Sequence, residues 1–135
     1  MQGLTIPKHI FDDMIAYCRE GCPNEACGIL AGRGNEVSRL YRMRNVEDSP
    51  VSYLMDSKEQ FEVMKALRDN GLSIVALFHS HTSSAAYPSA KDVQLAFYED
   101  SAYVIVSLSG REPAVKAFFI ANGVPEEIAI NCTRA

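Results

Sequence analysis

The sequence predicts an α/β fold, a single layered domain in which a mixed β-sheet is flanked by helices. Segments with helical spacing alternate along the chain with short apolar runs bounded by glycine, proline and polar residues, the pattern of interleaved helices and strands. The chain has 135 residues, the length of one ordinary domain. It contains no internal repeat, low-complexity tract or linker, so we expect one domain over residues 1–135.

The first half of the chain predicts a helix and then a β-hairpin. Helical spacing of apolar residues begins after Pro7, which suits a first helical turn, and ends before Gly21. Two apolar runs separated by a turn at 32–35 then indicate the hairpin. The expected elements of this half are a helix over 7–19, strands over 25–31 and 36–44, and a polar loop over 45–50.

The second half predicts two helices and several strands. Asp56 or Ser57 can cap a helix that Gly71 ends, and the apolar, β-branched run after Gly71 is typical of a buried strand. The expected elements are helices over 56–70 and 89–98, strands over 74–79, 102–108 and 114–121, and an edge strand over 124–131. Residues 51–55 are a weaker candidate for another edge strand.

The composition narrows the classes of function. The formal net charge is −4, which argues against a general nucleic-acid-binding surface because such surfaces are basic. No apolar stretch is long enough to cross a bilayer, and the N-terminal residues lack the basic and apolar regions of a secretory signal. The four cysteines contain no C-x-x-C pair, which favours buried free thiols in a reducing compartment over a zinc ribbon or redox site. We therefore expect a cytoplasmic protein without nucleic-acid or membrane partners.

Two histidines separated by one residue form the strongest functional signal. His79 and His81 lie at the end of the apolar run over 72–78. On a strand, residues i and i+2 point to the same face, so both imidazoles would leave the strand end side by side. Asp92 follows eleven residues after His81 and could supply a third ligand. Three protein ligands and one open position are the arrangement of catalytic zinc.

Three further polar residues have both a structural and a functional interpretation. Ser89 and Asp92 stand in the Ser-x-x-Asp spacing of a capping box, which could be their whole role. A capped helix end would also hold the Asp92 carboxylate for a metal and the Ser89 hydroxyl for a developing oxyanion. Glu25 begins an otherwise apolar strand. It is either a solvated carboxylate at a strand end or the general base that a metal-bound water needs.

Together these residues resemble the signature of the JAMM/MPN+ metallopeptidases, which is Glu25, then His79-x-His81, seven residues, and Ser89-x-x-Asp92. The resemblance implies Zn²⁺ held by His79, His81 and Asp92. It also implies a water as the fourth ligand, deprotonated by Glu25, which later protonates the departing amine. Ser89 would steady the oxyanion of the tetrahedral intermediate.

The likeness extends beyond the signature. The segment 23–28 resembles the one around the family glutamate, and the segments 45–50 and 103–108 resemble the short, single-domain bacterial branch. The layered fold of the family is related to that of the zinc deaminases. One departure is Thr82, where many members have proline, and we expect a more mobile loop over 82–88 as a result. The chain also has no room for the long insertions with which eukaryotic relatives hold ubiquitin chains.

Relatives of this short type imply a peptidase acting at the C-terminus of ubiquitin-like sulfur-carrier proteins that end in Gly-Gly. A diglycine tail is extended and lacks side chains, so it could enter a narrow channel and pair with a strand edge such as 51–55. The alternative is an MPN-type binding scaffold with weak catalysis, although such members usually lack part of the ligand set. A zinc deaminase is excluded because H-x-E and P-C-x-x-C are absent from the sequence. The sequence leaves a homodimer open.

Overall fold

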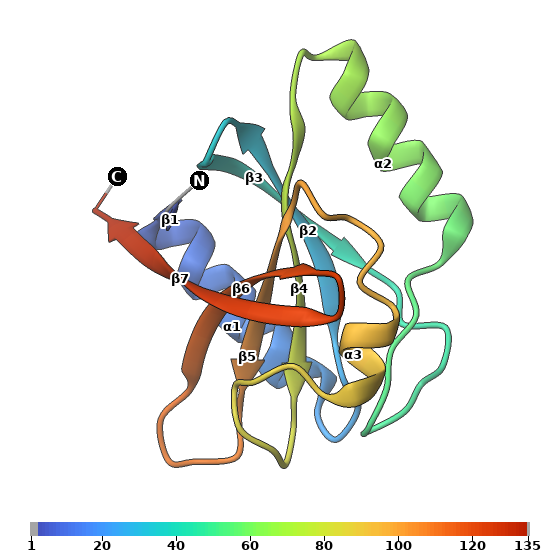
Figure 1. Cartoon of the computed structure of the whole chain (residues 1–135), viewed down its shortest axis with the longest axis vertical. Helices are drawn as coiled ribbons and strands as arrows, with labels where there is room; N and C mark the ends of the chain where they lie inside the picture. Colours follow the sequence, from blue (N-terminus) through green and yellow to red (C-terminus); the bar gives the residue numbers. More distant parts are fainter. Residues whose placement is uncertain (1–2, 135) are drawn as a thin grey trace.

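The structure, a computed structural model, describes residues 3–134, which form seven strands and three helices (Figure 1). The strands are β1 (Gly3–Pro7), β2 (Cys27–Arg33), β3 (Glu36–Met43), β4 (Ser73–His81), β5 (Ala102–Ser107), β6 (Ala114–Ala121) and β7 (Val124–Thr133). The helices are α1 (Lys8–Gly21), α2 (Ser57–Asp69) and α3 (Ala90–Gln94). This arrangement confirms the predicted α/β class with a mixed sheet flanked by helices.

The sheet is mixed, and it closes on itself. Its strands are hydrogen-bonded in the order β1-β3-β2-β4-β5-β6-β7, and β1 pairs with β7 to complete the ring. The β2–β3 hairpin is antiparallel, as the sequence predicts. β4 lies between β2, which runs antiparallel to it, and β5, which runs parallel to it. A parallel neighbour requires a crossover connection, and the segment between β4 and β5 that contains α3 provides it.

Both edge-strand predictions are wrong. β7 is paired on both sides, with β6 and with β1, so it is not an edge. β1 is not predictable from the sequence pattern, because this strand has five residues and runs directly into α1. Its Leu4 and Ile6 are fully buried. Residues 51–55 do not form a strand either, and only Met55 makes an isolated antiparallel bridge, to Asn45.

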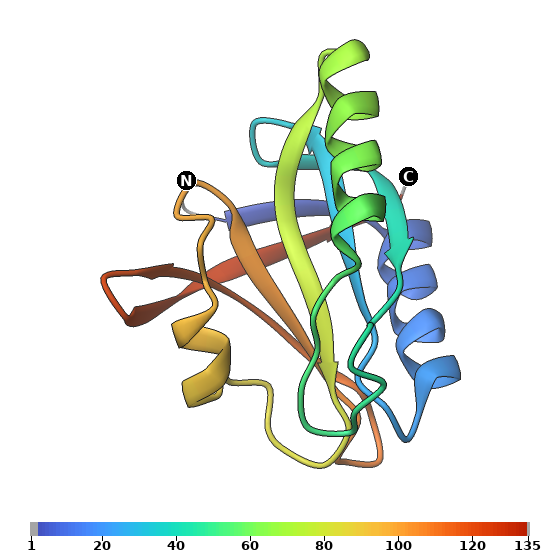
Figure 2. The same cartoon turned by 90° about the vertical axis from the view of Figure 1, so that its right-hand side faces the viewer.

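The helices lie on both sides of the sheet (Figure 2). α1 buries Ile10, Met14 and Cys18 in one core cluster. α2 is capped as predicted, because the Asp56 carboxylate accepts hydrogen bonds from two backbone N–H groups of its first turn, but it buries only Leu67. Among residues 3–134, no helix combines the length and the apolar character needed to cross a bilayer.

α3 is shorter than the predicted helix over 89–98. It ends at Gln94, and the next residues turn away from the helix axis (Figure 2). The backbone N–H of Tyr98 donates to the hydroxyl of Tyr103 at 3.0 Å instead of continuing the helical ladder. The apolar residues in this part of the chain therefore follow tertiary contacts, not helical periodicity.

The alternation of side chains along β4 divides the core and places the site. Phe78 belongs to the cluster that contains the α1 residues, and Leu77 belongs to the cluster on the opposite face. His79 pairs with Cys27 of β2 and Ile105 of β5, both in the Leu77 cluster. His79 and His81 therefore project to the side of the sheet that carries α3.

Candidate metal centre

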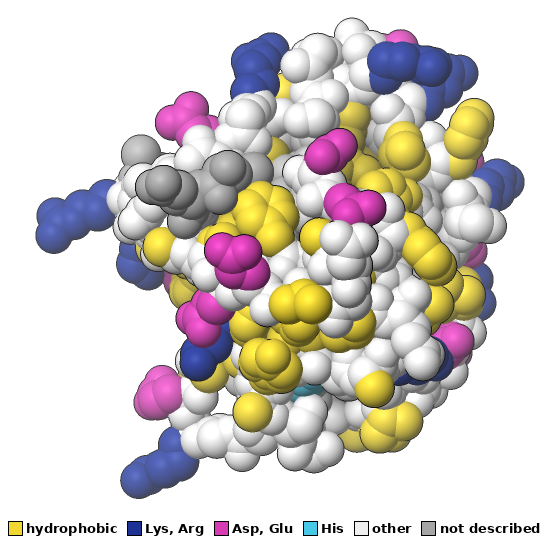
Figure 3. Space-filling view, in the orientation of Figure 1, with side chains coloured by type: hydrophobic (Ala, Val, Ile, Leu, Met, Phe, Trp, Pro, Cys, Tyr) yellow, Lys and Arg dark blue, Asp and Glu magenta, His cyan; other side chains and the backbone are white. Residues whose placement is uncertain are grey.

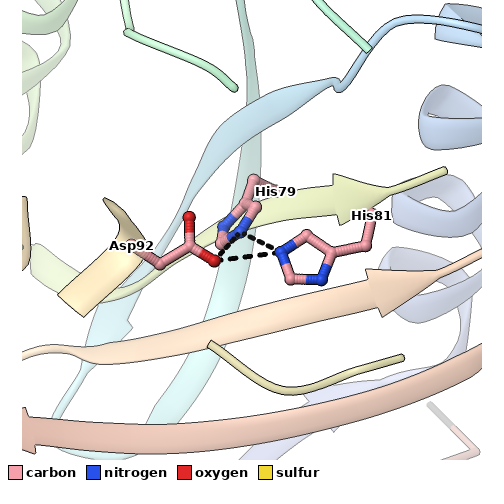
Figure 4. A group of neighbouring side chains, drawn as sticks. All are labelled: His79, His81 and Asp92. Carbon is pink, nitrogen blue, oxygen red and sulfur yellow. Dashed lines mark hydrogen bonds and ion pairs between the residues drawn. The ribbon is translucent and has the colours of Figure 1, made fainter. Parts of the chain in front are cut away.

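Three side chains converge at the end of β4 (Figure 4). Nε2 of His79 lies 3.1 Å from Nε2 of His81. Oδ2 of Asp92 lies 3.1 Å from Nε2 of His79 and 2.9 Å from Nε2 of His81. The structure thus brings together the three side chains that the sequence analysis groups as metal ligands, and these donor atoms could hold one ion.

Local structure explains how each side chain reaches this point. The pleat of β4 directs His79 and His81 to one face. The predicted capping box at the start of α3 is confirmed: Ser89 N–H donates to Asp92 Oδ2 at 2.9 Å, and Asp92 N–H donates to Ser89 Oγ at 3.1 Å. The capping and ligand interpretations of Asp92 are therefore compatible, because one oxygen, Oδ2, takes part in both.

Neighbouring groups orient the two imidazoles. Nδ1 of His81 lies 2.8 Å from the carbonyl oxygen of Ala85, a contact in which Nδ1–H donates and the lone pair stays on Nε2. The His79 ring stacks on Tyr53, with the ring centroids 4.4 Å apart and the planes at 23°. Both rings are buried. The imidazoles are therefore held with Nε2 directed toward Asp92.

Burial and mutual contacts shift the pKa values of the three side chains in different directions. Burial alone would raise the pKa of Asp92, but hydrogen bonds with His79 and His81 outweigh it and hold that pKa well below its ordinary value. Burial lowers the pKa of His79. Burial also acts to lower the pKa of His81, but its contacts with Asp92 and Ala85 leave that pKa above its ordinary value. Asp92 is thus held ionised and His79 neutral, the states in which these groups bind a metal, whereas a protonated His81 must release its proton before it can bind the ion.

The spacing of the donor atoms also suits zinc. Ligands about 2.0–2.1 Å from a tetrahedral ion lie about 3.3 Å from one another. The three separations of 2.9–3.1 Å are close to that value. Two nitrogens and one carboxylate oxygen are also ligand types that zinc takes in catalytic sites. The residues present therefore fit a zinc ion with three protein ligands.

Glu25 lies just before β2 with only 6% of its surface exposed. Its Oε1 is buried and has no hydrogen-bond partner within residues 3–134. Burial raises the pKa of Glu25 to about 7. The charges of His81, which lowers this pKa, and of Asp92, which raises it, have smaller effects. The interpretation of Glu25 as a solvated carboxylate is therefore wrong, and its role as the general base stays a prediction.

Ser89 is exposed at the entrance to the site. Within residues 3–134 its hydroxyl oxygen accepts from Asp92 N–H and the hydroxyl donates to no other group, so its proton is free for a substrate oxygen. Thr82 donates to the carbonyl oxygen of Pro50 at 3.2 Å. A proline at this position could not make that bond, which ties the start of the 82–88 loop to the 45–55 segment. The greater mobility expected for the 82–88 loop stays a prediction.

Several residues that no sequence pattern singled out support the site. Ser80, the spacer between the histidines, accepts a hydrogen bond from Ala26 N–H at 2.8 Å and so fastens the residue after Glu25 to β4. Tyr53 stacks on His79, and Asn45 bonds to the Glu25 carbonyl. No local pattern marks Tyr53; Asn45 belongs to one of the family-like segments, which is the one available signal.

A small apolar cavity of about 100 Å³ adjoins the centre. Tyr53, which stacks on His79, is part of its lining. Three exposed side chains, Leu54, Leu95 and Phe97, also line it. Figure 3 shows hydrophobic side chains gathered on the face that carries α3 and the β6–β7 hairpin, with a small area of histidine among them. The metal centre therefore has an apolar surface beside it.

Comparison with known proteins gives consistent matches over nearly the whole chain. A family model of prokaryotic homologues of the JAB domain matches residues 7–121. The CysO-cysteine peptidase of Mycobacterium tuberculosis is 38% identical over 133 residues, which cover 95% of this chain and 90% of that protein. A probable TtuB-protein conjugate cleaving protease of Thermus thermophilus is 34% identical, over 94% of this chain and 81% of that protein. A desampylase of Haloferax volcanii is 34% identical, over 82% and 85%.

Solved structures share the fold. The solution structure of a protein from Desulfitobacterium hafniense has a TM-score of 0.88 and 37% identity, and the match covers 98% of this chain and 94% of that one. A JAB1/MPN domain protein from Archaeoglobus fulgidus has a TM-score of 0.67 and 18% identity, with 97% and 100% covered. At that identity the second likeness concerns the fold alone.

Proposed function

The chain belongs to the family of prokaryotic homologues of the JAB domain, the JAMM/MPN family, and on this premise we propose that it is a zinc metallopeptidase. Its substrate is a ubiquitin-like sulfur-carrier protein, and it hydrolyses the bond after the C-terminal Gly-Gly of that carrier. The convergence of His79, His81 and Asp92 at the end of β4 carries the proposal. The Glu25 carboxylate, whose buried Oε1 has no hydrogen-bond partner among the described residues, supplies the candidate base.

The roles of the side chains follow from their positions. A Zn²⁺ ion bound by the three ligands would polarise a carbonyl group and lower the pKa of a bound water to about 7. Glu25 takes a proton from the attacking water, whose oxygen bonds to the carbonyl carbon. The C–N bond then breaks, and Glu25 returns the proton to the departing amine. Ser89 donates a hydrogen bond to the carbonyl oxygen as negative charge develops on it.

The relatives' names support the substrate class. One is named for the bond between CysO and cysteine, and another for the conjugates of TtuB with proteins. We infer a similar substrate here, a small carrier protein joined through its C-terminal carboxyl group to cysteine or another amine.

The segment beside the site suits a diglycine tail. Within residues 3–134, the N–H and C=O groups of Tyr53 make no backbone hydrogen bonds, although the ring of Tyr53 covers His79. An extended tail can pair with these groups, and glycine would let it pass close to the ring. The adjoining apolar cavity can receive an apolar side chain of the carrier.

A binding scaffold is the competing function, and the complete donor set argues against it. The discriminating experiment uses a carrier protein that ends in Gly-Gly and is extended by one cysteine. Zinc-loaded enzyme should reduce the mass of the carrier by one cysteine residue, as measured by intact-protein mass spectrometry. A chelator should abolish the cleavage, and a carrier with Ala-Ala in place of Gly-Gly should be cleaved poorly. Tight binding without cleavage would favour the scaffold.

A further inference from the structure

We propose that Asn45 is a positioning residue that sets the location of Glu25. The inference rests on the proposed function, in which Glu25 is the general base. Asn45 lies two residues after the end of β3, and 9% of its surface is exposed. It does not touch the donor atoms of the metal centre, so its effect would pass through Glu25.

The Asn45 amide uses its full hydrogen-bonding capacity. Its Nδ2 donates to the carbonyl oxygen of Glu25 at 3.0 Å and to that of Ser52 at 3.1 Å. Its Oδ1 accepts from the N–H groups of Glu47 and Leu54, both at 3.0 Å. An amide has two donors and two acceptor sites. A carboxylate would lose both donors, and an apolar side chain would leave buried backbone groups without partners.

The backbone of Glu25 is held from both of its ends by the same loop. Its N–H donates to the carbonyl oxygen of Ser49 at 2.8 Å, and its carbonyl oxygen accepts from Asn45. The next residue, Ala26, exchanges two hydrogen bonds with Ser80, which lies between the two histidines. The Glu25–Ala26 peptide is therefore fixed between the metal-binding strand and the loop that Asn45 organises.

The carboxylate itself has less support. Its Oε1 has no partner within residues 3–134, so its place depends on the main chain that carries it. Displacement of a reacting group by about 1 Å can cost on the order of 10²-fold in rate. Asn45 holds this main chain through the Glu25 carbonyl oxygen, so loss of the Asn45 amide should displace the Glu25 carboxylate.

The test is a double-mutant cycle of Asn45→Ala with Glu25→Gln, both zinc-loaded, with single-turnover cleavage of the diglycine carrier measured at saturating substrate. In the wild-type background Asn45→Ala should reduce the rate by about 10-fold to 10²-fold. In the Glu25→Gln background it should change the rate less than about twofold, because the residue through which it acts is gone. Equal reductions in both backgrounds would overturn the inference and leave the proposed function intact. A wild-type rate in Glu25→Gln alone would overturn the inference together with the base role of Glu25, whereas failure of the zinc-loaded wild type to cleave the carrier would overturn the proposed function.

Two further variants guard against a folding defect. Asn45→Asp keeps the acceptor bonds to Glu47 and Leu54 and removes only the donors. It should likewise reduce the rate in the wild-type background and leave the rate of Glu25→Gln nearly unchanged. Asn35 is the matched control, since its amide also donates to a backbone carbonyl, that of Gly3 at 3.0 Å. Asn35→Ala should affect the rate equally in both Glu25 backgrounds.

Amide hydrogen exchange supplies a readout that does not require turnover. The N–H of residue 25 should exchange faster in Asn45→Asp than in wild type, and it should keep its protection in Asn35→Ala. Unchanged protection of this amide in Asn45→Asp would overturn the inference.

Discussion

Oδ2 of Asp92 lies 2.9 Å from Nε2 of His81, although Asp92 belongs to α3 and His81 ends β4. The contact joins a helix start to a strand end through a loop of small residues. The Asp92 carboxylate that caps α3 is also the group that the two imidazoles hold ionised. Removal of the Asp92 or the His81 side chain should therefore weaken metal binding.

Substitution of a ligand should remove the metal. His81→Ala deletes one of three protein ligands, so we expect loss of stoichiometric zinc together with loss of activity. Zinc content after dialysis, measured by mass spectrometry, is the test. His9→Ala is the matched control, because His9 is exposed on α1 and should leave zinc content unchanged. Full zinc occupancy in His81→Ala would contradict the ligand assignment.

Substitution of the base should spare the metal. Glu25→Gln keeps the shape of the side chain and removes its ability to accept the proton. We expect zinc content like that of wild type and a turnover lower by about 10²–10⁴-fold, the usual contribution of general acid–base catalysis. Glu20, which is exposed on α1, gives the control variant Glu20→Gln. Normal cleavage by Glu25→Gln would show that another group acts as the base.

Ser89 should matter for both turnover and stability. Ser89→Ala loses the acceptor for Asp92 N–H, at a cost of about 1 kcal/mol of folding free energy. It also loses the donor for the substrate oxygen, which should lower turnover by about 10²–10³-fold. Urea denaturation and single-turnover kinetics at full zinc occupancy separate the two effects. A stability loss with unchanged turnover would leave Ser89 with the capping role alone.

The buried Glu25 should make the metal-free protein less stable as pH rises. Burial raises its pKa from 4.5 to about 7 in the folded state, so between these values the folded protein binds more protons than the unfolded chain. Its contribution to the free energy of unfolding therefore falls as pH rises through this window. The fall is at most about 3 kcal/mol, at 1.36 kcal/mol per pKa unit.

The comparison with Glu25→Gln isolates this effect, because Asp92, His79 and His81 titrate in both proteins. Relative to the variant, metal-free wild type should lose stability between pH 5 and pH 7, as followed by chemical denaturation. A difference that stays constant with pH would mean that the Glu25 pKa is not raised.

The family signature is readable in the sequence because its parts are local. The pleat of a strand puts His79 and His81 on one face whatever the rest of the chain does. The capping box of Ser89 and Asp92 is likewise a property of four consecutive residues. The α2 cap at Asp56 and the β2–β3 hairpin are predictable for the same reason.

The length of α3 and the closure of the sheet are not local in this sense. Beyond the end of α3, Tyr98 N–H bonds to the Tyr103 hydroxyl and not within a helix, and β7 is no edge because β1 pairs with it. Periodicity reports the preference of a segment, but such contacts between separate segments override it.

The sequence by itself determined the fold class, the three residues that converge as a ligand group and the Ser-x-x-Asp cap, since these depend on strand and helix periods within short segments. Only the tertiary structure decided how Glu25 is buried and held. Asn45 lies 20 residues from Glu25 in the chain, and Tyr53 reaches His79 from a separate loop. Such contacts form only when the fold brings separate segments together, and the burial that results raises the Glu25 pKa.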